Sequence, residues 1–241
     1  MNTIRFNNGN TEVIAHRGLS GIELENTCSA FVAAGNRSYF GIETDVHKTS
    51  DGKFVIFHDD RTGRVAGDDM IVENTTMRTL QAMVLIDKDG KRGREDLRMP
   101  ELVDYVRICK KYEKKAVLEL KNAFRPEEIL EIAKIIEAED YLENMIFISF
   151  DLRNLVTLRA SYPDTVCQFL VDDYTDDLVK ILVENNLDLD MCEKFVTKEI
   201  IDTLHENGRK INCWTCDNPE WAEQLADWDI DFITSNILEG C

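Results

Sequence analysis

The chain has few prolines, no long apolar run and no cysteine framework. Of its 241 residues only 4 are proline and 12 are glycine, which excludes collagen-like and proline-rich proteins. No apolar stretch reaches the roughly 18 residues that a membrane-spanning helix requires. Residues 1–10 are polar and lack the apolar centre of a secretory signal. The 7 cysteines are odd in number and scattered, as is typical of reduced thiols. We therefore expect a cytoplasmic protein without membrane insertion.

Basic residues are also scarce, with 28 Lys and Arg against 46 Asp and Glu and a net charge of -18. Nucleic acids and anionic membrane surfaces are bound by clusters of Lys and Arg, so we expect neither as a partner. A small phosphate-bearing substrate stays possible, because one cation and one arginine can hold it. The composition indicates no oligomeric state.

The chain does contain short β-branched runs that alternate with longer amphipathic segments. Helices are expected between most of the runs, at 126–139, 151–160, 175–185 and 219–228. The strands are expected at 12–16, 40–47, 115–121, 145–150, 165–171, 187–192, 210–215 and 231–235. This α/β pattern predicts a parallel sheet, and eight strands close a (β/α)₈ TIM barrel of about 250 residues. A doubly wound open sheet would show the same alternation.

One segment, residues 51–99, interrupts the alternation. It contains a strand-like run at 53–57, a polar stretch with glycines and a short helix at 77–86. We interpret it as a small insertion between strands 2 and 3 of the barrel. No linker or internal repeat divides the chain, so we expect one domain over residues 1–241.

Two of the 4 histidines follow strand-like runs, His16 in Ile-Ala-His and His58 in Val-Ile-Phe-His. The carboxyl ends of barrel strands carry the active site, and a pair of histidines can supply an acid and a base near neutral pH. His47 and His205 lack this setting, and we interpret them as structural.

Acidic residues alternate within two of the predicted strands. Glu43 and Asp45 lie on one face of a strand, about 6.6 Å apart along the backbone, and Glu119 and Lys121 repeat the pattern. Unpaired carboxylates inside a barrel are costly, and a cation between them removes the cost. Oxygen ligands suit Mg²⁺ or Ca²⁺ better than zinc. The alternative is a buried ion pair between the two strands.

Two further features of the sequence have chemical potential. Arg17, next to His16, can clamp a phosphate through its planar guanidinium, and Lys121 can add a point charge. Cys213 and Cys216 form a Cys-x-x-Cys pair between a strand and a helix, the setting of a redox pair. Nothing else indicates a thioredoxin-like unit, so we interpret the pair as coincidental.

Taken in order, several motifs resemble the glycerophosphodiester phosphodiesterase family over nearly the whole chain. They are His16-Arg17-Gly18, Glu25-Asn26-Thr27, Glu43-Thr44-Asp45-Val46, the run from Thr49 to Asp59, Glu119-Leu120-Lys121, Ser149-Phe150, Trp214-Thr215 and Asp231-Phe232-Ile233-Thr234. Each motif alone is weak, but the ordered set is specific.

The resemblance implies a (β/α)₈ barrel with a small insertion after the second strand, and hydrolysis of glycerophosphodiesters to glycerol 3-phosphate and an alcohol, a step of lipid and glycerol metabolism. It implies His16 and His58 as the general acid/base pair, and Glu43, Asp45 and Glu119 as ligands of one divalent cation, Mg²⁺ or Ca²⁺. Arg17 and Lys121 would face the phosphate, while Phe150 and Trp214 would form apolar walls. Attack by the glycerol 2-hydroxyl, giving a cyclic phosphate, and direct attack by water both stay open.

The sequence departs from the family pattern at two turn positions. Leu24 stands where proline usually precedes Glu-Asn-Thr, and Asn236 stands where proline often follows the last strand. Both departures concern backbone geometry more than chemistry, because every residue with an implied chemical role is present.

Two other functions share parts of this pattern. A sphingomyelinase D-like enzyme shares the histidine pair and acidic site, but lacks an insertion of this length and acts on lipid surfaces. A non-catalytic phosphodiester- or metal-binding protein would be free to lose a histidine or a carboxylate, and neither is lost here.

Overall fold

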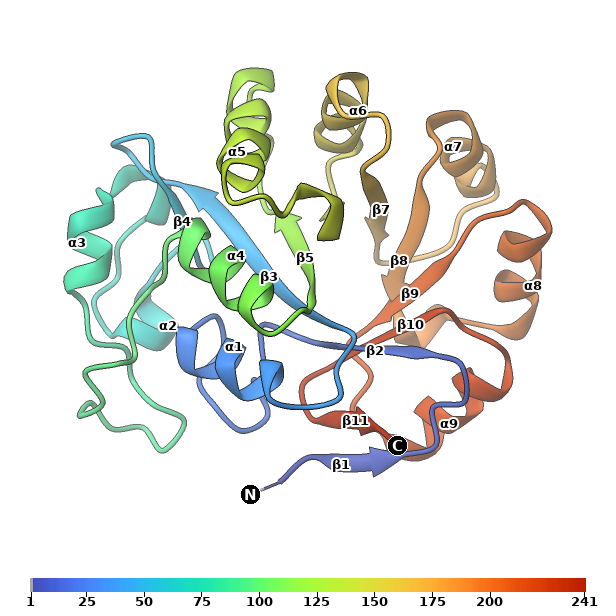
Figure 1. Ribbon diagram of the computed structural model, residues 1–241, viewed down its shortest axis with the longest axis horizontal. Coiled ribbons are helices and arrows are strands. Elements are labelled where there is room, and N and C mark those ends of the chain that lie inside the picture. The colour runs from blue at the N-terminus through green and yellow to red at the C-terminus, as the bar shows by residue number, and fades with distance from the viewer. Residues whose placement is uncertain (1) are drawn as a thin grey trace.

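The structure, a computed structural model, describes residues 2–241. Eight parallel strands close into a barrel, and Figure 1 shows the helices arranged outside them. In barrel order the strands are β2 (Glu12–Ala15), β3 (Gly41–Lys48), β5 (Lys115–Leu120), β6 (Met145–Ser149), β7 (Val166–Val171), β8 (Asp188–Cys192), β9 (Ile211–Trp214) and β10 (Phe232–Ser235). Because β10 also pairs with β2, the sheet is closed. The predicted TIM barrel is confirmed, and the open doubly wound sheet is excluded.

Alternate side chains of the barrel strands point to opposite faces, as strand geometry requires. One face contributes the apolar interior, formed by Ile14, Val117, Ile146, Ile148, Leu170 and Phe232. The other face packs against the outer helices in a larger cluster that includes Phe31, Tyr105 and Phe147. The barrel is therefore filled by side chains, and its free space lies at the mouth.

The outer helices begin where the sequence provides caps. In α9 (Pro219–Asp227), the Asn218 side chain accepts from Trp221 N at 2.8 Å and Pro219 occupies the first turn. In α5 (Pro126–Ala138), the Glu128 side chain accepts from Arg125 N at 2.8 Å. The remaining outer helices are α1 (Cys28–Gly35), α4 (Leu102–Lys111), α6 (Leu152–Ser161), α7 (Leu178–Asn185) and α8 (Lys198–Glu206), with 3₁₀ turns η2 (Leu142–Asn144) and η3 (Glu193–Phe195).

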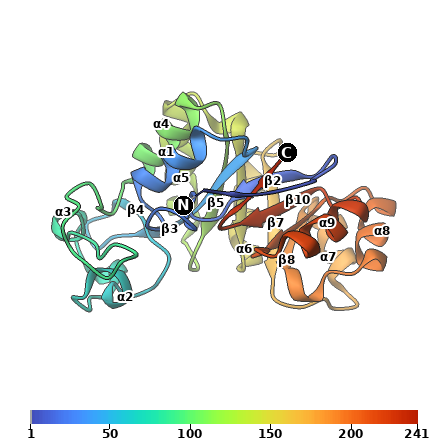
Figure 2. The ribbon, with the colours of Figure 1, turned by 90° about the horizontal axis from the view of Figure 1, so that it is seen from below.

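The predicted insertion lies between β3 and β5 and has its own small core. It contains β4 (Phe54–Ile56), α2 (Gly63–Ala66), the 3₁₀ turn η1 (Val72–Asn74) and α3 (Met77–Ala82). Figure 2 shows α2 and α3 beside the barrel. Leu24, one of the two departures from the family pattern, is buried in this core with Phe57 and Leu80. Its side chain therefore packs the segment between β2 and α1 against the insertion.

The helix expected at 77–86 is shorter than predicted, because α3 ends at Ala82. The chain continues in an extended conformation, in which Leu85 N donates to Leu97 O and Ile86 N donates to Val65 O. Leu85 is buried in the core of the insertion. Tertiary hydrogen bonds and burial thus override the helical pattern of the apolar run.

The two ends of the chain pair with each other beside strand β2 of the barrel. Strand β10 is followed by β11 (Leu238–Gly240), which pairs in parallel with β1 (Ile4–Phe6). Figure 1 places this two-stranded sheet near both termini, at the lower edge of the view. Within residues 2–241, no helix combines the length and apolar character needed to cross a membrane.

Candidate active site

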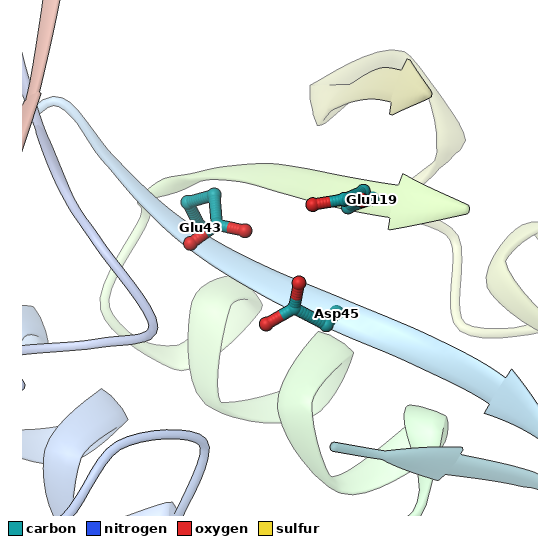
Figure 3. Close-up of side chains that lie close together, drawn as sticks. All are labelled: Glu43, Asp45 and Glu119. Atoms are coloured by element: carbon teal, nitrogen blue, oxygen red, sulfur yellow. The ribbon is translucent and has the colours of Figure 1, made fainter. Parts of the chain in front are cut away.

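Three carboxylates meet inside the barrel mouth (Figure 3). Glu43 and Asp45 come from β3, and Glu119 comes from β5, where it is the register partner of Asp45. One carboxylate oxygen of each lies within 4.8 Å of the others, and all three residues are buried. The structure therefore brings together the carboxylates that the alternating pattern selected.

Burial sets the electrostatics of this cluster. Burial, followed by the charge of Asp45, raises the pKa of Glu119 to about 8 and holds the pKa of Glu43 well above its usual range. Burial would raise the pKa of Asp45 too, but Lys121 and Arg17 outweigh it and lower that pKa. The three carboxyl groups are thus stable together only with protons or with further positive charge between them.

The donor set fits a hard divalent cation. Among residues 2–241, Asp45 Oδ1 and Glu119 Oε1 are buried and have no hydrogen-bond partner of good geometry, although the Lys121 ammonium lies beside both. Buried carboxylate oxygens normally accept such bonds. Oxygen-only donors of this kind are those that Mg²⁺ and Ca²⁺ prefer. The acidic cluster therefore has the chemistry of a divalent metal site.

Two cationic side chains border the carboxylates. Lys121 Nζ lies 2.9 Å from Glu119 Oε1 and 3.4 Å from Asp45 Oδ1, so the ion pair considered as an alternative is also present. Arg17 Nε lies 3.7 Å from Asp45 Oδ2, and its Nη1 donates to Glu25 Oε1 at 2.9 Å. Arg17 and Lys121 thus place two positive charges beside three buried carboxyl groups.

The two predicted histidines both lie at this site but come from different elements of the fold. His16 follows β2 directly, and its Nδ1 lies 2.8 Å from Asn236 Oδ1. Burial, followed by the charge of Arg17, lowers the pKa of His16 to about 4. His58 Nδ1 lies 2.6 Å from Asp59 Oδ1, and burial lowers the pKa of His58 as well. Both imidazoles are therefore neutral near pH 7.

His58 lies in the insertion, as the strand-like run at 53–57 predicted, and not at the end of one of the eight barrel strands. It follows β4, which pairs antiparallel with β3 outside the closed barrel. The antiparallel return brings the chain back alongside the acidic strand, where Phe57 N donates to Asp45 O at 3.0 Å. His58 is thus carried to the carboxylates by a hairpin.

One cavity collects these groups. Phe150 and Trp214 form one side of it, with ring centroids 5.7 Å apart in an edge-to-face arrangement. An aromatic wall of this kind suits the carbon skeleton of a small polar ligand. The cavity is lined by His16, Arg17, Glu43, His58, Glu119, Lys121, Ile148, Phe150, Leu170, Asp190, Trp214 and Thr234.

Asn26 supports the carboxylate cluster, although the sequence analysis gave it no role. Its Nδ2 donates to Asp45 Oδ2 at 2.7 Å, while Thr44 Oγ1 donates to its Oδ1 at 2.6 Å. Asn26 has φ 54°, a left-handed conformation that asparagine tolerates better than most residues. The Glu-Asn-Thr motif was the available signal, but its contact with Asp45 depends on the fold.

Arg64 is a second residue that the sequence analysis missed. From α2 of the insertion, its guanidinium donates to Asp59 Oδ2 at 2.6 Å and to Glu25 at 2.6 and 2.9 Å. Asp59 contacts His58, and Glu25 contacts Arg17. One arginine therefore connects a predicted catalytic histidine with the predicted phosphate ligand.

Asp190 on β8 is a third missed residue. It lines the cavity, is 1% exposed, and its Oδ1 has no hydrogen-bond partner among residues 2–241. Burial, followed by the charge of Glu119, raises its pKa well above the usual range. The alternating Asp188 and Asp190 showed the same period of two as Glu43 and Asp45, so a signal was present.

The other histidines and the cysteine pair fall outside the cavity. His47 is fully buried, with Nε2 3.2 Å from the carbonyl oxygen of His58, and His205 contacts Asp231 on the outside. Cys213 and Cys216 are free and buried, and burial raises the pKa of Cys216 to about 12. A reactive thiol requires the opposite shift, so this geometry does not favour a redox role.

Comparisons with known proteins agree with this geometry. A glycerophosphodiester phosphodiesterase of Caldanaerobacter subterraneus subsp. tengcongensis is 26% identical, with 95% of each chain covered. YhdW of Bacillus subtilis, which bears a provisional name as a glycerophosphodiester phosphodiesterase, is 26% identical with 93% of each covered. The structure of an Oleispira antarctica phosphodiesterase, in complex with the product sn-glycerol-3-phosphate, has TM-score 0.86 and 25% identity and covers 94% of this chain and 93% of that one.

This chain is a TIM barrel with a carboxylate cluster and two histidines at its mouth, and it is similar over its length to phosphodiesterases of this kind. It is therefore a phosphoric diester hydrolase. The model of the glycerophosphoryl diester phosphodiesterase family matches residues 16–239. The chain belongs to that family.

Proposed function

We propose that this protein hydrolyses glycerophosphodiesters to glycerol 3-phosphate and an alcohol, with His16 and His58 as the general acid/base pair and a divalent cation held by Glu43, Asp45 and Glu119. The observation that carries the proposal is the single cavity in which both histidines, two of these carboxylates, Arg17 and Lys121 converge. General acid/base catalysis needs the two groups on either side of one reacting phosphate.

The cation would be Mg²⁺ or Ca²⁺, because the three proposed ligands offer only oxygen. When bound, it neutralises phosphate oxygens and acidifies a hydroxyl group near it. Asp45 Oδ1 and Glu119 Oε1 support this placement, because both are buried beside the Lys121 ammonium and lack a hydrogen bond of good geometry.

The chain's own residues would bind and orient the diester. Arg17 and Lys121 would hold the phosphate, Arg17 from a guanidinium already fixed by Glu25. Phe150 and Trp214 would hold the glycerol or the leaving alcohol by apolar contact. Each histidine keeps one nitrogen for the substrate, because the Nδ1 atoms contact Asn236 and Asp59. Attack by the glycerol 2-hydroxyl and attack by water use the same pair of groups.

We further propose that the domain spans residues 1–241 and acts in the cytoplasm on small soluble diesters. The 7 cysteines are all free, which supports a reducing compartment. Clustered basic residues for nucleic acid or an anionic membrane are lacking in a sequence of net charge -18.

The deciding experiment measures glycerol 3-phosphate released from glycerophosphocholine and glycerophosphoethanolamine, with Mg²⁺, with Ca²⁺ or with EDTA. Release that EDTA abolishes and one cation restores is the expected result, and it also identifies the cation and the preferred head group. A folded protein that releases no product with either cation would contradict the proposed activity. Release that EDTA leaves unchanged would contradict the metal site alone.

A further inference from the structure

Asn236 is the first residue after β10 and contacts His16. Its Oδ1 lies 2.8 Å from His16 Nδ1 and 2.7 Å from Ser20 Oγ. On sequence grounds this position differed from the family pattern, where proline is frequent, and only a change of turn geometry was expected. Proline has no side-chain acceptor and could not make this contact with His16.

Asp217 decides which way the Asn236 amide faces. Asn236 Nδ2 donates to Asp217 Oδ2 at 2.6 Å, while Asn236 N and Ser235 Oγ both donate to Asp217 Oδ1 at 2.8 Å. The oxygen and nitrogen of an amide are assigned from its hydrogen bonds. A flipped amide would place its oxygen 2.6 Å from a carboxylate oxygen, which leaves two acceptors without a proton between them. The carboxylate therefore holds Asn236 Oδ1 toward His16.

The orientation of Asn236 determines where the proton of His16 sits. An amide oxygen only accepts, so His16 Nδ1 must donate. A neutral imidazole carries one proton, and the tautomer is set by the hydrogen bond that one nitrogen makes. His16 lies in the cavity, and its backbone N is held by Ser235 O at 2.9 Å. The proton is thus on Nδ1, and Nε2 keeps its lone pair for the substrate.

We propose that Asp217 and Asn236 are positioning residues that hold His16 as the Nδ1–H tautomer, so that Nε2 is a proton acceptor in the resting enzyme. The inference rests on the proposed acid/base role of His16 and deepens it. Neither Asn236 nor Asp217 lines the cavity, so both act through His16 and not on the diester.

The tautomer can be measured without substrate. The chain has only 4 histidines, and the two ring nitrogens of each can be resolved by ¹⁵N NMR and assigned with His→Ala variants. At pH 7.5 we expect a protonated-type shift at Nδ1 and an unprotonated-type shift at Nε2 of His16. In Asn236→Ala the proton should move toward Nε2, and in Asp217→Asn the two tautomers should mix. Asn207→Ala, which removes an exposed asparagine at the end of α8, is the matched control.

Steady-state kinetics give the second measurement. We expect Asn236→Ala to lower kcat by about 10- to 100-fold, as loss of a partner that orients a ligating or catalytic imidazole does. KM should stay close to that of the wild type, because Asn236 does not touch the substrate. Wild-type His16 with its proton on Nε2 would overturn the proposal, and so would an unchanged kcat in a variant whose tautomer has shifted. If the wild type hydrolyses no glycerophosphodiester, the proposed function fails, while the NMR result still decides the tautomer.

Discussion

At the scale of single residues, the site combines groups whose ordinary pKa values are disturbed by burial. Burial lowers the pKa of His16 to about 4 and raises the pKa of Glu119 to about 8. Such opposed shifts within one cavity are characteristic of functional sites. They also make two predictions that simple measurements can check.

The first prediction concerns the histidine pair. His16→Ala and His58→Ala should each lower turnover by about 10² to 10⁴-fold, the usual contribution of a positioned acid or base. His205→Ala is the matched control, because His205 contacts Asp231 on the outside of the barrel. Turnover is measured with a glycerophosphodiester at saturating cation. Near-normal turnover in either active-site variant would refute the assignment of that histidine.

The second prediction concerns stability without metal. Glu119 has a folded pKa of about 8 against an ordinary value of 4.5, because burial and then Asp45 disfavour its charge. Between these pH values the folded protein holds a proton that the unfolded chain has lost, so stability falls as pH rises through this window. In Glu119→Gln this contribution is absent. The Tm of the variant minus the Tm of the wild type, both measured in EDTA, should therefore increase from pH 5 to pH 8.5.

The same variant should also lose affinity for the cation, measured by calorimetry. Glu131→Gln, at a half-exposed position on α5, serves as the control and should follow the wild type at every pH. Parallel Tm curves for Glu119→Gln and wild type would argue against a buried carboxyl group at residue 119.

At the scale of elements, the insertion is part of the active site. It carries His58 on the return from β4 and Arg64 on α2, and both reach the barrel mouth. The existence of the insertion could be predicted, because residues 51–99 break the alternation of strands and helices. The antiparallel pairing of β4 with β3 could not, since pairing depends on a partner that the local pattern does not name.

Arg64 tests the role of this insertion. In Arg64→Met, Asp59 and Glu25 lose their common partner, so His58 and Arg17 should lose their alignment. We expect kcat/KM to fall by about 10- to 100-fold, in the range found for residues that orient catalytic groups. Arg64→Lys should not restore activity, because an ammonium lacks the planar fork that bridges two carboxylates.

The control for Arg64 is Arg61→Met. Arg61 lies in the same loop and pairs with Asp69, away from the cavity. Its replacement should leave kcat/KM unchanged, and thermal melting should show that both variants are folded. Equal kinetic effects of the two substitutions would show that Arg64 has no special link to the site.

At the scale of the whole molecule, the two chain ends are joined to each other beside the barrel. Glu239 in β11 is buried and accepts hydrogen bonds from Ser38 N at 3.0 Å and Ser38 Oγ at 2.8 Å. Thr3 Oγ1 donates to its other oxygen, and Arg5 Nη2 lies 3.0 Å from Oε1. The N-terminal strand, the loop before β3 and the C-terminal strand thus share one carboxylate.

Removing that carboxylate should affect stability and not catalysis. Glu239→Ala removes the acceptor shared by Ser38, Thr3 and Arg5, and because these donors are at least partly exposed, each lost hydrogen bond costs about 0.5–1.5 kcal/mol. We expect a clear decrease in the free energy of unfolding, measured in urea, and a smaller one in Glu239→Gln, which keeps an acceptor. The kcat of the folded protein should be that of the wild type. A loss of kcat without loss of stability would contradict a purely structural role.

The sequence by itself determined the eight barrel strands, the insertion and the alternating carboxylates, because these features are local patterns with fixed periods. Glu43 and Asp45 share a face for the same reason that any residues two apart in a strand do. The ordered motifs also identified the family. Boundaries shifted by up to three residues, as at α7, and the helix at 77–86 was too long, because capping and burial compete with periodicity.

Only the tertiary structure decided which groups touch across the barrel mouth. Asn236 is 220 residues from His16, and the contact exists only because β10 closes the barrel against β2. Arg64 reaches Glu25 and Asp59, and Asp190 points into the cavity, through the same closure and the docking of the insertion. Such contacts depend on the relative placement of whole elements, and no local pattern in the chain contains that placement.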